Sequence, residues 1–541
     1  MEAIKMTPQA LITEWAYFLW QERGMAQMYT HLVLAALFPI YAGSHASLRR
    51  PPSAAIPIKK KRKTREGDDE DSEDEELELE QHLGLTPSDA IMFPILAGFT
   101  LSGLYFLIKW LKDPVLLNQI LGYYFSTLGV FGVGKLATDA LNVTTSVVFP
   151  NMWSAKGQIY HINQTLSAQL IESPSPSRPE TKIHRRFVEA KTNPFPSIFS
   201  SIRFPARTTK RIWAIRALLN QHWVFRGYIH GILSAKSRVR LNDALGFLIG
   251  VTCIALYNMN GKPWYLTNLM GFGFCYGSLQ LMSPTTFWTG SLVMGGLFIY
   301  DIIMVFYTPL MITVATTLDA PMMLVVPGPN RGSMLGLGDI VLPGIMIGLA
   351  LRFDLYLHYL RKGQASSDIA LPSYKKPTAS QTGDLFWTAR HASLRPAALA
   401  DAAFRKTYFH AALVGYVAGM AVTLSVLNIW NHAQPALLYL VPGVLIALWG
   451  TALVRGEIGV MWRFTESGDD IEDVKGVRVE VKKVEEGRDG EVKKEEGEGE
   501  ERKVGGRGVK RYGEREDFVM YFTLSTPRGE DVREREVGKS D

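Results

Sequence analysis

The stretch SMLGLGDIVLPGIMIGLAL, residues 333–351, holds one ionisable side chain, Asp339, among residues that are otherwise apolar or small. A helix of this length extends roughly 28 Å, because each residue adds 1.5 Å, and the hydrocarbon core of a bilayer is roughly 30 Å thick. The stretch is therefore typical of a membrane-spanning helix.

Eight further runs of this kind occur in the 541 residues, and the charges gather between them and in the last 75 residues. A soluble enzyme is excluded, and the net charge of +6 is not the mark of a nucleic-acid-binding protein. We expect an all-α polytopic membrane protein with nine transmembrane helices. The predicted spans are 28–46, 90–111, 115–136, 241–257, 264–281, 286–308, 333–351, 408–427 and 434–453.

Polar segments separate these spans. We expect disorder in the loop 47–89, in part of the loop 137–240 and in most of the tail, because such segments cannot bury enough apolar surface to fold alone. A further polar loop, 352–408, interrupts the later spans. The predicted parts are an N-terminus at 1–27, the first three helices at 28–136, the long loop at 137–240, the membrane core with helices four to nine at 241–453, and the charged tail at 454–541.

Basic residues predict the orientation. Nine spans place the loops 47–89, 137–240 and 352–408 on one side of the membrane, and the two shorter of these contain 17 Lys and Arg residues. The segments on the opposite side contain 5. Because basic loops stay in the cytosol, we expect a lumenal N-terminus and a cytosolic C-terminus.

Two carboxylic acids lie well inside predicted spans. Asp301 occurs in GGLFIYDIIMVF and Asp339 in the stretch quoted above. A carboxylate in lipid is costly, so each acid is a functional candidate. Asp139, Asp243 and Asp354 lie at span ends, where interfacial water reaches them, and we expect structural roles for these three.

The depths of Asp301 and Asp339 match. Each lies six or seven residues from the outer end of its predicted span, which is roughly 10 Å below the same surface. Consecutive helices joined by a short connection are usually neighbours. Two carboxyl groups that close cannot both ionise, so they would share one proton and act as a paired acid and base. Aspartic proteases use this chemistry, but transporters also use paired membrane acids as proton relays, and a structural pair stays a third reading.

The residues near the acids favour exposed backbone. Gly336 and Gly338 allow another chain to approach closely and loosen the start of a helix, which suits binding of an unwound peptide as an added strand. Pro435 lacks an N–H group and disfavours helix before it. Irregular backbone is therefore expected at 433–436.

Three short motifs carry a resemblance. Tyr300-Asp301, Gly336-Leu337-Gly338-Asp339 and Pro435-Ala436-Leu437 are similar to the YD, GxGD and PAL motifs of presenilin-type intramembrane aspartyl proteases, and they occur in this order on the sixth, seventh and ninth predicted spans. Longer strings resemble the signal peptide peptidase branch of that family. These strings are 92–107, 318–327, 333–354 and 432–442.

The resemblance implies a presenilin-like helix bundle with aspartic endopeptidase activity. It implies cleavage of peptide bonds within membrane-spanning segments, chiefly remnant signal peptides and type II membrane proteins, in the endoplasmic reticulum membrane. No cofactor, metal or nucleic acid is expected. The expected partners are membrane-embedded peptides, the lipid bilayer, further copies of the chain in a homo-oligomer and quality-control proteins. A proton-coupled transporter and a non-catalytic quality-control scaffold remain as alternatives.

The same resemblance assigns residue roles. Asp301 and Asp339 would form the catalytic dyad. The residues expected to shape the site or bind substrate are Tyr300, Gly336, Leu337, Gly338, Pro435, Ala436 and Leu437.

Overall fold

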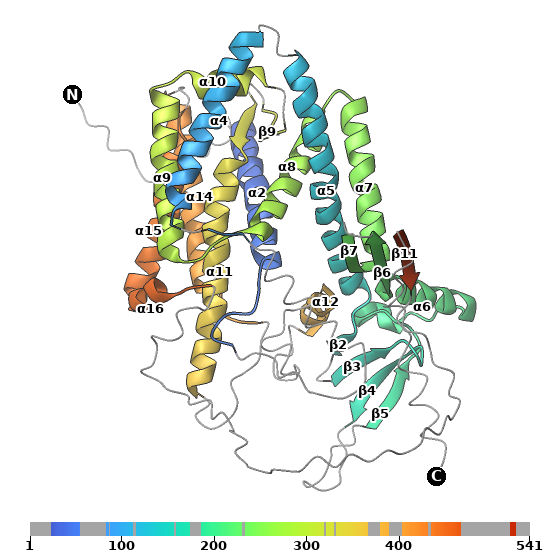
Figure 1. The fold of residues 1–541 in the computed structure, drawn as a ribbon. Helices are drawn as coiled ribbons and strands as arrows, with labels where there is room; N and C mark the ends of the chain where they lie inside the picture. Colours follow the sequence, from blue (N-terminus) through green and yellow to red (C-terminus); the bar gives the residue numbers. More distant parts are fainter. Residues whose placement is uncertain are drawn as a thin grey trace, which may run out of the picture. The chain divides into compact units, whose positions relative to one another are not determined.

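Figure 1 shows the fold of the protein in a computed structural model. Most of the segments predicted to be disordered, including 55–82 and most of the tail, lie outside the described residues. Their disorder stays a prediction. The described residues are 23–54, 83–85, 87–111, 115–155, 158–173, 186–229, 233–318, 321–328, 332–365, 379–388, 403–430, 434–466 and 520–525.

Long helices occupy all nine predicted spans. Among the described residues, eight of them are long and apolar enough to cross a membrane, and the ninth, α8, contributes polar residues such as Asn268 to the protein interior. The all-α polytopic fold is thereby confirmed. The long helices are α2 (Arg23–Ala46), α4 (Asp89–Leu111), α5 (Val115–Val148), α7 (Leu241–Met259), α8 (Trp264–Leu281), α9 (Phe287–Phe306), α11 (Gly338–Ala365), α14 (Thr407–Trp430) and α15 (Leu437–Arg455).

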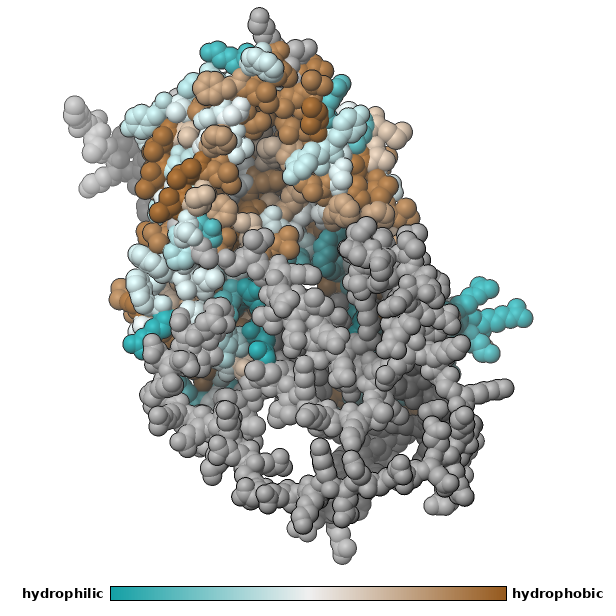
Figure 2. Space-filling model, viewed as in Figure 1, coloured by the Kyte–Doolittle hydropathy of each residue, from teal (hydrophilic) through white to brown (hydrophobic). Residues whose placement is uncertain are grey.

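The helices differ strongly in burial. The most apolar window of α11 is 83% buried, whereas that of α4 is 0% buried, so α11 is a central helix and α4 a peripheral one. Phe99 and Phe106 of α4 are 77% and 66% exposed. Figure 2 shows hydrophobic residues over the upper part of the same view, as expected for surface that faces lipid.

One predicted span begins differently. The run 333–351 contains a strand, β10 (Ser333–Gly336), which pairs antiparallel with β9 (Met323–Val326), and only then the helix α11. A short helix, α10 (Leu310–Thr317), lies between α9 and this hairpin. Apolar composition alone does not distinguish a buried strand from a helix, so the predicted helix start at 333 was wrong.

The helices α9, α11 and α15 contact one another and form the centre of the membrane core. Helix α14 packs closely on α15, because a methyl group added to Gly415 would lie 2.4 Å from the carbonyl oxygen of Gly443. Small residues let membrane helices approach this closely. The start of α15 is thereby held against the core.

A small sheet follows α5, where the sequence predicts only a polar loop. It has the antiparallel order β2 (Met152–Ala155), β3 (Gln158–Asn163), β4 (Ala168–Ser173) and β5 (Arg186–Lys191). The 3-10 helix η1 (Ser197–Ser201) and the helix α6 (Ala206–Asn220) continue the chain.

The helix α12 (Ala379–Thr388) joins this sheet to the loop after α11. The Asp384 carboxylate accepts hydrogen bonds from the backbone N–H groups of Asn151 and Met152 at 2.7 and 3.0 Å, and the Trp387 indole donates to the Val147 carbonyl at 2.7 Å. The segments that follow α5 and α11 therefore lie at the same end of the helices, as the nine-span prediction requires.

A second unit, of which the structure describes residues 222–229, 233–239 and 520–525, contains a three-stranded sheet in the order β11-β6-β7. Strand β11 pairs antiparallel with β6, with Met520 opposite Ile229. The strands are β6 (His222–Ile229), β7 (Leu233–Arg240) and β11 (Met520–Ser525).

Buried charges connect distant parts of the membrane core. After α15 and the short helix α16 (Ile458–Arg463), Glu466 pairs with Arg352 of α11 at 2.6 Å and with Arg49, which follows α2. The Ser283 hydroxyl, in β8 (Met282–Pro284), also donates to Glu466, and β8 pairs in parallel with β1 (Leu83–Leu85). Burial would raise the pKa of Glu466, but the two arginines hold it below its ordinary value of 4.5.

This ion-pair cluster predicts a pH-dependent stability. A carboxylate whose pKa is depressed by folding contributes stability above its ordinary pKa and loses it as the pH falls through the native value. We expect Glu466→Gln to cost about 3–5 kcal/mol at neutral pH, because it leaves buried arginines without their anion. The difference from the wild type should vanish on acidification well below pH 4.5.

Thermal unfolding in detergent, followed by loss of helical circular dichroism, tests this. Asp139→Asn is the control, since Asp139 pairs with the 55%-exposed Lys135 and should cost at most about 1 kcal/mol. A difference between wild type and Glu466→Gln that persists unchanged into acid would contradict the prediction.

Candidate active site

Asp301 lies in the second-to-last turn of α9 and is 5% exposed. The helix continues to Phe306, and Tyr307 and Pro309 follow. Because α9 contacts both α11 and α15, the carboxylate is surrounded by the central helices.

Asp339 is the second residue of α11. The helix starts there because the Leu337 carbonyl accepts the N–H groups of Ile340 and Val341, at 3.2 and 2.9 Å. The prediction that Asp339 lies six residues inside a helix was wrong, since the residues before Gly338 form β10. Asp301, near the end of α9, and Asp339, at the start of α11, nevertheless lie at adjoining ends of contacting helices.

The Pro435-Ala436-Leu437 segment reaches the first acid directly. The backbone N–H of Leu437 donates to Asp301 Oδ2 at 3.1 Å. Leu437 opens α15, and the first N–H groups of a helix have no partner within the helix. Pro435 is buried and non-helical, so the turn before α15 presents this donor to the carboxylate.

The glycines before Asp339 have different surroundings. A methyl group added to Gly336 would lie 3.2 Å from Asp339 Oδ2, whereas one added to Gly338 meets nothing within 4 Å. Leu337 instead packs against α8, where a methyl group on Gly271 would lie 3.1 Å from Leu337 Cδ2. Gly336 therefore leaves room for the Asp339 carboxylate itself, and Gly338 borders open space.

Tyr300 points elsewhere. Its ring packs against α4, where a methyl group on Gly98 would lie 3.6 Å from Tyr300 Cε2. Tyr300 therefore belongs to the contact between α9 and α4, and its expected role in shaping the site stays a prediction.

Tyr416 of α14 is a neighbour that no motif marks. Its hydroxyl lies 3.5 Å from the backbone carbonyl oxygen of Asp339, and the side chain is fully buried. Pro343 has no N–H to offer the carbonyl four residues before it, which is that of Asp339. The tyrosine hydroxyl is the donor that replaces it.

The β9-β10 hairpin has one blocked edge and one open edge. The Asn268 side chain both accepts from the Val325 N–H and donates to the Val325 carbonyl, at 2.7 and 2.8 Å. Val325 lies opposite Met334 and directs its N–H and C=O groups away from β10. The N–H and C=O groups of Met334 therefore point away from β9, at the outer edge of β10. Within the described residues, β10 pairs with β9 alone.

The three acids at span ends have structural partners. Asp243 caps α7 by accepting from the Arg240 N–H at 2.7 Å, and Asp139 accepts from the Tyr276 hydroxyl at 2.7 Å. Asp354 accepts from the N–H of Phe409 at 2.9 Å.

Comparisons with known proteins identify relatives of this chain. The family model described as signal peptide peptidase matches residues 75–468. Human signal peptide peptidase is 27% identical over 454 residues, covering 82% of this chain and 85% of the relative. A probable intramembrane protease of Schizosaccharomyces pombe is 35% identical over 220 residues, covering 40% of this chain and 62% of the relative. No solved structure matches the chain.

The membrane-spanning fold and these relatives define the class, an intramembrane protease. Since the family match covers most of the chain and includes both acids, the chain belongs to the signal peptide peptidase family.

The position of Gly336 predicts a sensitive substitution. Gly336→Val should displace the Asp339 carboxylate and lower cleavage of a membrane peptide by about 100-fold, because small shifts of a reacting group cost that much. Gly295→Val on α9 is the matched control, since nothing lies within 4 Å of a methyl group there. Equal turnover by both variants would show that the space at Gly336 is unimportant.

Proposed function

We propose that this protein is an aspartyl intramembrane protease whose catalytic dyad is Asp301 and Asp339. The observation that best supports the proposal is that three helices, α9, α11 and α15, contact one another around the acids. The Asp301 carboxylate of α9 accepts a hydrogen bond from the Leu437 N–H that opens α15, and Asp339 lies at the start of α11, which contacts both α9 and α15.

The proposed reaction needs one proton shared by the two acids. The ionised carboxyl group takes a proton from a water molecule while the protonated one donates to the oxygen of the scissile carbonyl. The resulting hydroxide equivalent attacks the carbonyl carbon. The carboxyl group that took the proton from water then donates it to the amide nitrogen. As the C–N bond breaks, one hydroxyl of the diol intermediate returns its proton to the other carboxylate, which leaves a carboxylic acid, an amine and one proton shared by the two acids.

The proposed substrate is an extended peptide that adds as a strand to β10. The open edge at Met334 lies five residues before Asp339. The Asn268 side chain occupies the outer edge of β9, so the outer edge of β10 is the one that a peptide can pair with in this hairpin. Strand addition would unwind a membrane helix and expose its amide bonds.

The proposed setting is the endoplasmic reticulum membrane, with the N-terminus in the lumen and the C-terminus in the cytosol. The bias of basic residues supports this orientation. The proposed substrates are remnant signal peptides and type II membrane proteins. Self-association and quality-control partners belong to the same proposal, which rests on the family resemblance.

The dyad proposal predicts that Asp301→Ala and Asp339→Ala each lower cleavage by at least about 100-fold while the protein stays folded. The assay uses purified protein and a labelled membrane peptide in detergent, with products identified by mass spectrometry. Detergent permits no gradient, so product formation is incompatible with transport as the sole function. Asp139→Asn should cleave normally, and near wild-type cleavage by either alanine variant would refute the dyad.

Strand addition predicts a separate effect at the open edge. Met334→Pro removes an N–H that points away from β9, so the hairpin should persist while substrate pairing weakens. We expect a KM raised several-fold, by the loss of a hydrogen bond worth about 1 kcal/mol. Met334→Ala removes the same 62%-exposed side chain but keeps the N–H, and identical kinetics of the two variants would rule out pairing at this position.

A further inference from the structure

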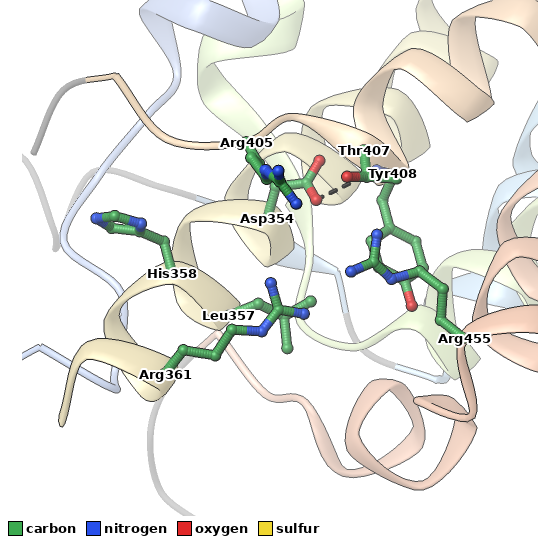
Figure 3. Close-up of a pocket in the computed structure, with 8 residues that line it drawn as sticks. All are labelled: Asp354, Leu357, His358, Arg361, Arg405, Thr407, Tyr408 and Arg455. Atoms are coloured by element: carbon green, nitrogen blue, oxygen red, sulfur yellow. Dashed lines mark hydrogen bonds between the residues drawn. The ribbon is translucent and has the colours of Figure 1, made fainter. Parts of the chain in front are cut away.

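A cavity lies near the C-terminal end of α11, far from Asp339 at the start of that helix. It encloses about 220 Å³ between the last turns of α11, the start of α14 and the end of α15. Each element contributes an exposed arginine, namely Arg361, Arg405 and Arg455. Figure 3 shows their guanidinium groups around the same space.

The one acid that lines the cavity is already bonded to backbone. Asp354 accepts hydrogen bonds from the N–H groups of Tyr408 and Phe409, at 3.2 and 2.9 Å. It thereby caps the first turn of α14, and the positive end of that helix offsets its charge. Among the described residues, Asp354 forms no ion pair with these arginines.

A second acid, Glu457, holds two of the arginines. It pairs with Arg361 at 2.5 Å and with Arg455 at 3.2 Å, and it accepts from the Tyr408 hydroxyl at 2.7 Å. Burial would raise the pKa of Glu457, but these partners keep it below its ordinary value, so the acid stays ionised. One carboxylate therefore serves two guanidinium groups.

Arg405 has no ion pair with any residue that the structure describes, and it is exposed at the cavity. A guanidinium group has five N–H donors arranged to bind two oxygens of a phosphate. The hydroxyl of Thr407 also lines the cavity. The cavity thus offers unused donors and an excess of positive charge.

Exposed tryptophans lie just beyond the end of α15 that borders the cavity. Trp462 of α16, which follows α15 directly, packs on Trp288 and Trp449 with ring centroids 5.3 and 6.0 Å apart. Trp288 and Trp462 are 47% and 55% exposed. Tryptophans of this kind gather at the interface between membrane and water.

We propose that this cavity binds the phosphate of an anionic phospholipid headgroup. The three guanidinium groups supply the charge, Arg405 supplies the free donors, and the neighbouring tryptophans place the site where a lipid phosphate lies. The volume exceeds the roughly 30 Å³ of a water molecule several times and accommodates a phosphodiester. The site is independent of the protease proposal, since it is separate from both acids.

Lipid binding to the full-length protein tests the proposal. Phosphatidylserine is titrated into phosphatidylcholine nanodiscs that hold the protein, and bound lipid is measured by native mass spectrometry. We expect Arg405→Gln to weaken phosphatidylserine binding about fivefold, the usual effect of one basic residue near a membrane surface. Arg405→Lys should bind with intermediate affinity, since it keeps the charge but loses the planar fork.

Arg463→Gln is the matched control, because Arg463 is exposed on α16 at the same interface but does not line the cavity. Equal weakening by Arg463→Gln would show general surface attraction and overturn the proposal, as would wild-type binding by Arg405→Gln. Tighter binding of inorganic phosphate than of phosphatidylserine would assign the cavity to a soluble phosphate and overturn the lipid assignment. Unchanged thermal unfolding of Arg405→Gln in detergent without lipid confirms that the variant is folded.

Discussion

The core depends on one contact, the hydrogen bond from the Leu437 N–H to Asp301. Away from water, a carboxylate needs a donor and the first turn of a helix needs an acceptor, and either group is costly when left alone. Here the Leu437 N–H is the donor for the Asp301 carboxylate, and that carboxylate is the acceptor for the first turn of α15. The contact requires α15 to begin at Leu437, which the buried, non-helical Pro435 enforces, and it requires α15 to stay in place, which the close packing of Gly415 on Gly443 ensures.

Much of this arrangement follows from composition. Membrane spans are visible as long apolar runs because lipid tolerates little else, and all nine runs contain a long helix. Asp301 and Asp339 stand out because acids are rare in such runs. Counting spans also predicts that the polar loops after α5 and α11 lie on the same side of the membrane. The contact between α12 and the end of α5 is consistent with that prediction.

Other features could not be read from the sequence because they depend on partners far along the chain. Ser333–Gly336 is as apolar as the helix after it, and it is a strand because β9 lies alongside. Tyr416 looks like any buried aromatic residue until the carbonyl freed by Pro343 is placed beside it. The sheet after α5 is built from a polar segment whose short strands carry no strong alternation, so it was missed.

The pairing of Arg352 with Glu466 also bears on how the chain is made. Synthesis proceeds from the N-terminus, so α11 enters the membrane more than a hundred residues before Glu466 exists. Until then a guanidinium group in the middle of the most buried helix has no counter-ion. The segment after α16, rather than either acid of the site, therefore supplies the anion for this buried guanidinium group, and a nascent chain that has not yet reached Glu466 holds Arg352 without its ion pair.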